Sequence, residues 1–276
     1  MSKIKDDFIN YISNETNIRK IPTGITKLDN IYGGGLPIGL TMIGANTGLG
    51  KTTFTLQLAD TMAKEENVKV LFFSLELSKY ELLSKSLSRI SYLNADLIKH
   101  EPNEFIDNKV ENIDLYFDKY KEIEDSIFLV DSVRDIKGII GNSIAFCRKY
   151  ADYKVIIVID YLQYINGDSL NDKQNVDSIT KQLKTLCSEF NVSVIAISSL
   201  SRDGAKKNDI SSFKESGLIE YTADYGIILK IKEKTKGLAF DEEDNIITLE
   251  FLKNRFGSKG SFDLKYYGNY ATFIEN

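Results

Sequence analysis

The sequence predicts an α/β protein with a mostly parallel sheet, and two observations support that prediction. Short runs of apolar, often β-branched residues alternate with amphipathic helical segments along most of the chain, which is typical of a parallel sheet covered by helices on both faces. The first apolar run leads at once into a Gly-containing loop and then into Lys51, Thr52 and Thr53 at the start of a helix. This order of strand, loop and helix is the context of a phosphate-binding loop.

Length and composition fit one large α/β domain. The chain has 276 residues, of which 42% are hydrophobic and 27% charged, enough for a sizeable core. No apolar run has the length of a membrane span and the N-terminus lacks the apolar stretch of a signal peptide, so we expect a cytoplasmic protein with no membrane partner. Cys147 and Cys187 lie far apart and His100 is the one histidine. We therefore expect two reduced packing cysteines and no zinc or His-rich metal site.

The net charge of −5 is concentrated in one segment. Residues 101–126 hold nine acidic side chains and three lysines, so the rest of the chain is close to neutral. We expect this segment to form a peripheral helical insertion. The composition leaves room for a nucleic-acid surface elsewhere, although no strong basic patch indicates one.

Each element is predicted by its own local pattern. Helical spacing of apolar residues predicts a short helix within residues 1–20, and Ser78 followed by Glu81 predicts a capping box at the start of another. Continuous apolar runs predict buried strands. One expected strand ends at residue 45, and the others cover residues 68–74, 127–130, 155–160 and 192–197. The expected helices cover about residues 51–64, 78–90, 136–150 and 175–190.

The loop after the first strand is the expected nucleotide-binding segment. Unpaired N–H groups at the helix start, the helix dipole and the Lys51 ammonium converge on one volume that favours phosphate, and Thr52 offers a hydroxyl to Mg²⁺. Ala45 stands where the first Gly of the consensus usually lies, and Ala does not adopt a positive φ at low cost. The whole segment is Ala45, Asn46, Thr47, Gly48, Leu49, Gly50, Lys51, Thr52 and Thr53.

Two acidic residues follow buried strands. Asp160 ends a run of five apolar residues, as a Walker B acid that holds Mg²⁺ does, although a plain turn acid can be placed in the same way. Glu76 follows the strand at 68–74 and is the candidate general base for the water that attacks the γ-phosphate. The alternative is a surface Glu favoured by a helix dipole. Because ligands bind at the carboxyl ends of parallel strands, we expect both acids beside Lys51.

Five further blocks resemble a known family over about residues 21–273. In order, they look like the motifs of the C-terminal ATPase domain of DnaB-type replicative helicases. The blocks are FSLELS at 73–78, VIDYLQYI at 158–165, VSVIAISSLSR at 192–202, FKESGLIEYTAD at 213–224 and KNRFGSKG at 253–260.

The resemblance implies a RecA-like fold with a C-terminal antiparallel extension, and ATP and Mg²⁺ as cofactors. It also implies a hexameric ring that moves 5′ to 3′ along single-stranded DNA. The domain would span residues 21–276, and residues 1–20 resemble the linker helix that docks on the next subunit.

The same resemblance assigns roles to the site residues. It implies that the Lys51 and Thr52 pair holds phosphate and Mg²⁺, that Glu76 activates water and that Asp160 is the Walker B acid. Two further residues, Lys253 and Arg255, match the Lys-x-Arg finger that reaches the γ-phosphate bound by the adjacent subunit. On a strand, residues two apart project from the same face, and Arg can stabilise charge on a transferring phosphoryl group. A finger supplied by a neighbour requires a head-to-tail homo-oligomer.

The DNA-binding loops of the family would fall at about residues 166–173 and 201–209. The second loop is basic and is suited to binding the phosphates of the DNA backbone without reading the base sequence. The first loop has a single cation. A solvated loop is the alternative for both. The expected DNA contacts are Lys173 in the first loop and Arg202, Lys206 and Lys207 in the second.

Two departures from the family keep other functions open. Ser199 stands where a Gln usually senses the γ-phosphate, and Ser lacks the reach and amide donors of Gln. We also expect the chain to lack the N-terminal helical domain common in these helicases. The alternatives are a RadA-like repair ATPase, whose zinc module and protease-like domain are not seen, and an ATP-binding loader or regulatory factor that does not unwind DNA. A primase or loader would be a further partner of the helicase.

Three aromatic residues near the C-terminus, Tyr266, Tyr267 and Phe273, could stack on the adenine base. Alternating aromatic residues in a terminal hairpin more often belong to a core. The sequence leaves both roles open.

Overall fold

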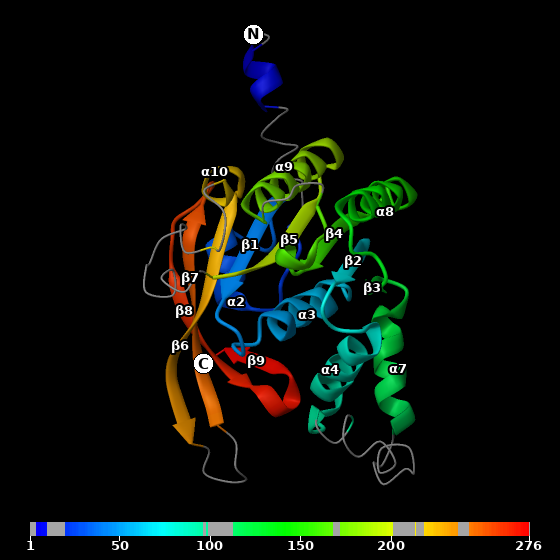
Figure 1. The fold of residues 1–276 in the computed structure, drawn as a ribbon, viewed down its shortest axis with the longest axis vertical. Helices are drawn as coiled ribbons and strands as arrows, with labels where there is room; N and C mark the ends of the chain where they lie inside the picture. The colour runs from blue at the N-terminus through cyan, green and yellow to red at the C-terminus, as the bar shows by residue number, and fades with distance from the viewer. Residues whose placement is uncertain are drawn as a thin grey trace.

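A nine-stranded sheet runs through the described part of the chain, in the order β3-β2-β4-β5-β1-β6-β7-β8-β9 (Figure 1). The computed structural model describes residues 4–9, 20–95, 98, 113–167, 172–200, 213, 218–236 and 243–275. The strands from β3 to β6 pair in parallel, and β7, β8 and β9 add to β6 in antiparallel order. The predicted mostly parallel sheet with an antiparallel C-terminal extension is confirmed.

The central parallel strands β1, β2, β4 and β5 are buried on both faces, and for that reason they appear in the sequence as continuous apolar runs. Every residue of β1 is buried. The five strands predicted from such runs are confirmed, with bounds that differ by at most two residues. The nine strands are β1 (Gly39–Ala45), β2 (Val68–Ser74), β3 (Ile127–Val130), β4 (Lys154–Asp160), β5 (Ser193–Ser199), β6 (Tyr225–Lys236), β7 (Glu243–Asn254), β8 (Ser261–Tyr267) and β9 (Thr272–Glu275).

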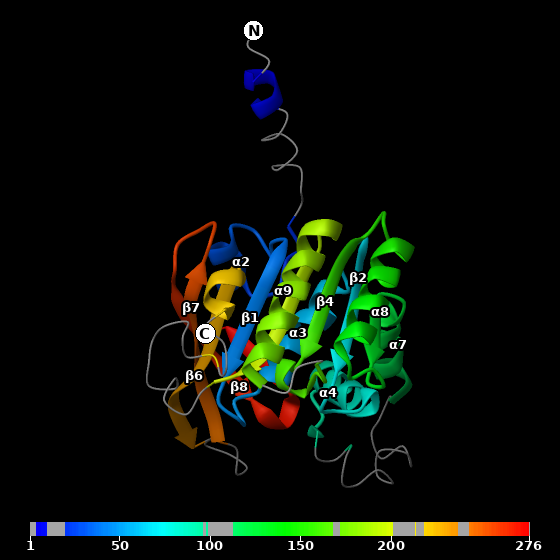
Figure 2. The ribbon, with the colours of Figure 1, turned by 45° about the horizontal axis from the view of Figure 1, so that its top comes forward.

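Helices cover both faces of the sheet and enclose two apolar cores. One core contains residues of α2 (Thr26–Tyr32), α3 (Lys51–Met62), α4 (Lys79–Ser91) and α7 (Ile113–Glu124). The other contains residues of α8 (Ile136–Lys149), α9 (Asp172–Phe190) and α10 (Ile219–Thr222). Figure 2 shows α8 and α9 in front of the parallel strands and α3 behind them. Two short 3₁₀ turns are also present, η1 (Leu162–Tyr164) and η4 (Gly268–Tyr270).

Some predicted elements differ in extent from those observed. The helix expected from residue 175 begins at Asp172, which shortens the loop expected at 166–173. Of the acidic segment 101–126, the described part forms α7 at the edge of the molecule (Figure 1), and residues 101–112 lie outside the described chain. Of the segment 1–20, residues 4–9 are helical with exposed Ile4 and Phe8.

Both cysteines are buried and free, as expected for packing residues. Burial raises the pKa of Cys147 to about 11 and that of Cys187 to about 12. These thiols are therefore neutral at physiological pH. Within the described residues, no helix combines the length and apolar character needed to cross a membrane.

The capping box predicted at the start of α4 is confirmed. The Ser78 side chain accepts from the Glu81 N–H, and the Glu81 side chain accepts from the Ser78 N–H. We expect Ser78→Ala to lower the free energy of unfolding by about 1 kcal/mol, because the first turn loses its cap. Ser84→Ala is the control, since its hydroxyl bonds within the helix to the Tyr80 carbonyl. Urea unfolding measures both, and equal losses would contradict the capping role.

Candidate functional site

The loop that joins β1 to α3 has the backbone of a phosphate cradle. Gly48 and Gly50 have φ values of +84° and +76°, which favour glycine. A Cβ at Gly48 would meet nothing within 4 Å, so the loop is open there. At Gly50 it would lie 2.8 Å from Tyr266 Cζ and 3.0 Å from Phe273 Cζ. Ala45 is not among the residues with positive φ, so replacing the consensus Gly with Ala costs no backbone strain.

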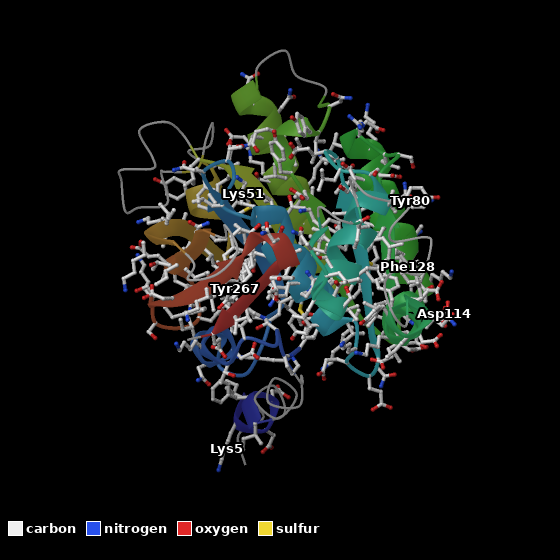
Figure 3. All side chains as sticks on the ribbon, turned by 90° about the horizontal axis from the view of Figure 1, so that it is seen from below. Lys5, Lys51, Tyr80, Asp114, Phe128 and Tyr267 are labelled. Carbon is white, nitrogen blue, oxygen red and sulfur yellow. The ribbon has the colours of Figure 1, made fainter. Side chains whose placement is uncertain are left out.

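The Lys51 ammonium is hydrogen-bonded to two carbonyl groups of this loop. Its Nζ donates to the Ala45 carbonyl at 2.8 Å and to the Asn46 carbonyl at 3.2 Å. Burial lowers the pKa of Lys51, and the carboxylates of Asp160 and Glu76 act in the opposite direction. A partly desolvated ammonium at the start of a helix is well placed to bind phosphate. Figure 3 shows Lys51 at the start of α3, beside the C-terminal hairpin that carries Tyr267.

The two predicted acids lie at neighbouring strand ends. Asp160 is paired in register with Ser74, the last residue of β2, and its carbonyl accepts the Leu75 N–H at 2.7 Å. Glu76 follows directly and is exposed. Both acids line one cavity of about 500 Å³ with Lys51, and the parallel register of β2 and β4 brings them together. The cavity is also lined by Thr47, Gly48, Gly50, Thr52, Thr53, Leu77, Glu81, Ser84, Lys85, Ala95, Tyr161, Ser199, Tyr266 and Gly268.

Asp160 has the environment of a group that needs a cation. Its side chain is 1% exposed, and Oδ2 has no hydrogen-bond partner among the described residues. Burial raises the pKa of Asp160 to about 6, although the Thr52 hydroxyl hydrogen-bonds to it and lowers the value. The Thr52 hydroxyl and the Asp160 carboxylate are oxygen ligands of the kind that Mg²⁺ takes, together with water and phosphate. The two residues therefore fit a nucleotide-bound Mg²⁺.

No group of three or more His, Cys, Asp and Glu residues that could hold a metal occurs in the described ranges. A Mg²⁺ held by one carboxylate, one hydroxyl, water and phosphate needs no such group. The described chain thus offers Mg²⁺ few side-chain ligands and depends on the nucleotide for the rest.

Aromatic residues of the C-terminal hairpin pack next to the phosphate loop. Tyr266 stacks on Phe273 with ring centroids 4.3 Å apart. Phe273 is buried and contacts Phe54 of α3 edge to face. Tyr266 lines the cavity, and burial raises its pKa while a hydrogen bond to Thr53 lowers it. Phe273 is therefore a core residue, whereas Tyr266 meets the cavity.

Gln163 is a polar residue of this region that sequence reasoning missed. It lies on η1, three residues after Asp160, and its Nε2 donates to Ser198 Oγ at 2.8 Å. Its Oε1 accepts the Ser199 N–H at 3.2 Å. An amide side chain is thus fixed beside Ser199, the position where the resemblance leads us to expect a Gln. Its place in the VIDYLQYI block was the one available signal.

Lys253 and Arg255 do not lie together on one strand face, so that expectation was wrong. β7 ends at Asn254, and Arg255 is the first residue of the turn that follows. Its N–H donates to the Asp224 carbonyl at 3.0 Å. Lys253 Nζ donates to the Tyr221 carbonyl at 3.4 Å. Neither cation is among the described residues that line the 500 Å³ cavity. Arg255 instead lines a second cavity, of about 920 Å³, with residues at the start of β1.

The structure does not describe the side chains of the four predicted DNA-binding residues. Arg202, Lys206 and Lys207 lie outside the described residues. Lys173 falls in the first turn of α9, a helical position where a loop was expected, and its side chain is not described. DNA contact by these four cations stays a prediction.

The fold and the phosphate loop define a RecA-like P-loop nucleotide-binding domain. The chain belongs to the DnaB-like helicase C-terminal domain family, whose model matches residues 20–275. It is 32% identical over 274 residues to the replicative DNA helicase DnaB of Geobacillus stearothermophilus, covering 93% of this chain and 57% of that protein. It is 29% identical over 267 residues to the replicative DNA helicase DnaC of Bacillus subtilis (strain 168), covering 94% of this chain and 57% of that one. The chain thus spans a little over half the length of these relatives.

Two solved structures have the same fold. One is an isolated ATPase domain, which superposes with a TM-score of 0.83 at 26% identity, covering all of this chain and 99% of that one. A DnaB-like replicative helicase, described with its interactions with primase, superposes with a TM-score of 0.80 at 26% identity. It covers all of this chain and 67% of that one. Both likenesses extend over the antiparallel extension as well as the parallel strands.

We expect Asp160→Asn to stabilise the nucleotide-free protein by about 1–3 kcal/mol above pH 7, because it removes a buried charge with an unpartnered oxygen. The native pKa of Asp160, about 6, lies above the value of an unfolded Asp. The wild type therefore loses stability as pH rises towards 6, and the advantage of Asn should shrink below pH 6. Urea unfolding from pH 5 to 8 measures this.

Asp135→Asn is the matched control, because an exposed N-cap accepts Asn equally well and should change stability by less than about 0.5 kcal/mol. Mg²⁺-ATP should raise the melting temperature of the wild type more than that of Asp160→Asn. An Asp160→Asn protein less stable than the wild type at pH 8 would contradict the cost assigned to this buried charge.

Proposed function

We propose that this chain is the motor of an ATP-dependent DNA helicase that moves 5′ to 3′ along single-stranded DNA during replication. The family membership supports this class of activity. The observation that carries the proposal is the separation, within one chain, of the nucleotide cavity from the Arg255 finger. If a neighbouring subunit completes each ATP site, hydrolysis at one site can be coupled to the next subunit of an oligomer. A site that is complete within one chain does not require an oligomer.

The residues around the 500 Å³ cavity would divide the work of ATP hydrolysis. Lys51 and the loop N–H groups bind the phosphates, and the hydroxyl of Thr52 and the carboxylate of Asp160 hold Mg²⁺. When bound, Mg²⁺ neutralises charge on the phosphate oxygens. Glu76, exposed at the end of β2, orients the attacking water and accepts its proton.

Arg255 lies too far along the sheet to serve its own chain's nucleotide. Its partner Asp224 contacts Leu40 near the start of β1, and the phosphate loop begins after Ala45 at the other end. Five residues of extended chain at about 3.3 Å each place these ends roughly 17 Å apart. A finger at the amino end of one sheet can meet a nucleotide at the carboxyl end of the next, in head-to-tail order.

Head-to-tail contact of this kind either closes into a ring or continues as a helical filament, and we propose a closed homo-hexamer. Residues 1–20 would act as the linker helix that docks on the next subunit, and the exposed Ile4, Phe8 and Ile9 give it an apolar surface. The domain of residues 21–276 would carry the ATPase. A primase or a loader would be a further partner, since one solved relative is described with its primase interactions. We propose that the assembly works in the cytoplasm.

DNA would be held by cations that track phosphates. We propose that Arg202, Lys206 and Lys207, together with Lys173 at the start of α9, contact the strand. Gln163 follows Asp160 by three residues and is hydrogen-bonded to Ser198 and Ser199 at the end of β5. It therefore links the strand end that carries Asp160 to the end of β5.

The alternatives kept at the start are less favoured. The family match and the relatives named above are replicative helicases, rather than RadA-like repair ATPases. The loader or regulatory factor that does not unwind DNA differs from the helicase in one measurable respect, strand separation.

Strand separation on a forked DNA substrate tests the proposal. We expect the wild type to hydrolyse ATP faster with single-stranded DNA and to separate the fork. Lys51→Ala should lower kcat for ATP hydrolysis by a factor on the order of 10² or more, because the transferring phosphoryl loses its cation. Lys64→Ala, beyond the end of α3, is a control with unchanged activity. ATP hydrolysis without strand separation by a hexameric wild type would contradict the helicase and favour the loader.

A further inference from the structure

Asp224 is a buried carboxylate to which the proposed function assigns no role. Its side chain is 1% exposed, at the point where the chain enters β6. Oδ2 accepts from the Leu40 N–H at 2.9 Å and from Lys184 Nζ at 2.5 Å, and Oδ1 accepts from Arg255 Nη1 at 3.1 Å. A buried charge is costly unless it is paired and hydrogen-bonded, and this carboxylate has a donor from three separate parts of the fold.

The backbone of Asp224 contacts the same two neighbours as its side chain. Its carbonyl accepts the Arg255 N–H at 3.0 Å, and its own N–H donates to the Leu40 carbonyl at 2.9 Å. Asp224 therefore fixes Arg255 at both the main chain and the guanidinium. It fixes the start of β1 in the same way.

The space for this carboxylate depends on Gly39. The residue has a φ of +126°, and a Cβ there would lie 2.6 Å from Asp224 Oδ2. Any side chain at this position would push the carboxylate away from Leu40. The first residue of β1 is thus shaped to admit the acid that holds Arg255.

Arg255 keeps donors for a second anion. Its side chain is 55% exposed, and the ion pair with Asp224 uses Nη1 alone, whereas a guanidinium has five N–H donors. Its Cζ also lies 5.6 Å from the centre of the Phe256 ring. The guanidinium is therefore held by a carboxylate and a ring, with an exposed part that can meet a phosphate.

We propose that Asp224 is a positioning residue that holds the Arg255 guanidinium where it can reach the nucleotide bound by the adjacent subunit. The proposal rests on the finger role given to Arg255 above. A long side chain fixed before the reaction loses less conformational freedom in the transition state than a free one. Because Asp224 also bonds to Leu40, each subunit's finger is attached to the strand that carries its own phosphate loop.

Asp224→Asn tests the proposal in the assembled protein. An amide has one oxygen where the carboxylate has two, so it cannot serve Leu40, Lys184 and Arg255 together. We expect kcat for ATP hydrolysis to fall at least tenfold while KM for ATP changes less than threefold, since a finger acts on the transition state. Lys184→Gln removes the other cation on the same carboxylate and is the matched control, with kcat within twofold of the wild type.

A double variant separates positioning from a structural role. If Asp224 acts through Arg255, Asp224→Asn combined with Arg255→Ala has the same kcat as Arg255→Ala alone. Losses that multiply would overturn the positioning role. If Asp224→Asn alone does not fold, Asp224→Asn with Lys184→Gln removes the buried charge together with one partner and carries the same expectation.

The failures of the two proposals are distinguishable. An Arg255→Ala protein with wild-type kcat, in assemblies of the wild-type native mass, would overturn the finger itself. A large loss in Arg255→Ala combined with wild-type kcat in Asp224→Asn would overturn the positioning role and leave the finger in place.

Discussion

The rest of the structure depends on the complete burial of β1 between β5 and β6. Every side chain of this strand is buried, and pairing on both edges fixes its register against Ser193 and Tyr225. A strand held in this way cannot shift along its axis without breaking two ladders of hydrogen bonds. The phosphate loop at its carboxyl end and the Asp224 contact at its amino end are therefore held at a constant separation.

Two buried carboxylates, Asp160 and Asp224, lie at the two places where a function is proposed. Asp160 carries the cost of burial with one oxygen unpartnered among the described residues, and Lys51 is partly desolvated beside it. A bound nucleotide with Mg²⁺ would supply both charged groups with the partners that they lack in the chain. Asp224 is buried to the same degree, but its partners are already present in the chain. Asp160 thus has an oxygen left for a ligand, whereas both oxygens of Asp224 are used within the chain.

Features that depend on local sequence or on the general rule for parallel strand ends could be predicted, and features that depend on particular contacts between distant residues could not. The β2 and β3 bounds and the Ser78 capping box follow from neighbouring residues, and the meeting of Glu76 with Asp160 follows from the general rule for parallel strand ends. The position of Arg255 depends on where β7 stops pairing with β6. The register of this pairing has two irregularities, so the end of β7 does not follow from the sequence pattern. The contacts of Gln163 and Asp224 likewise join segments far apart in sequence, and no periodicity reports them.

The central claim is that each ATP site is shared by two subunits, and subunit mixing tests it most directly. Arg255→Ala subunits keep a complete nucleotide cavity but offer no finger, whereas Glu76→Ala subunits offer a finger but cannot activate water. Each variant alone should be inactive. In an equal mixture, about a quarter of head-to-tail interfaces combine an intact cavity with an intact finger, so ATPase activity should reappear. Mixed assemblies, verified by native mass, with no more activity than either variant alone would contradict the shared site.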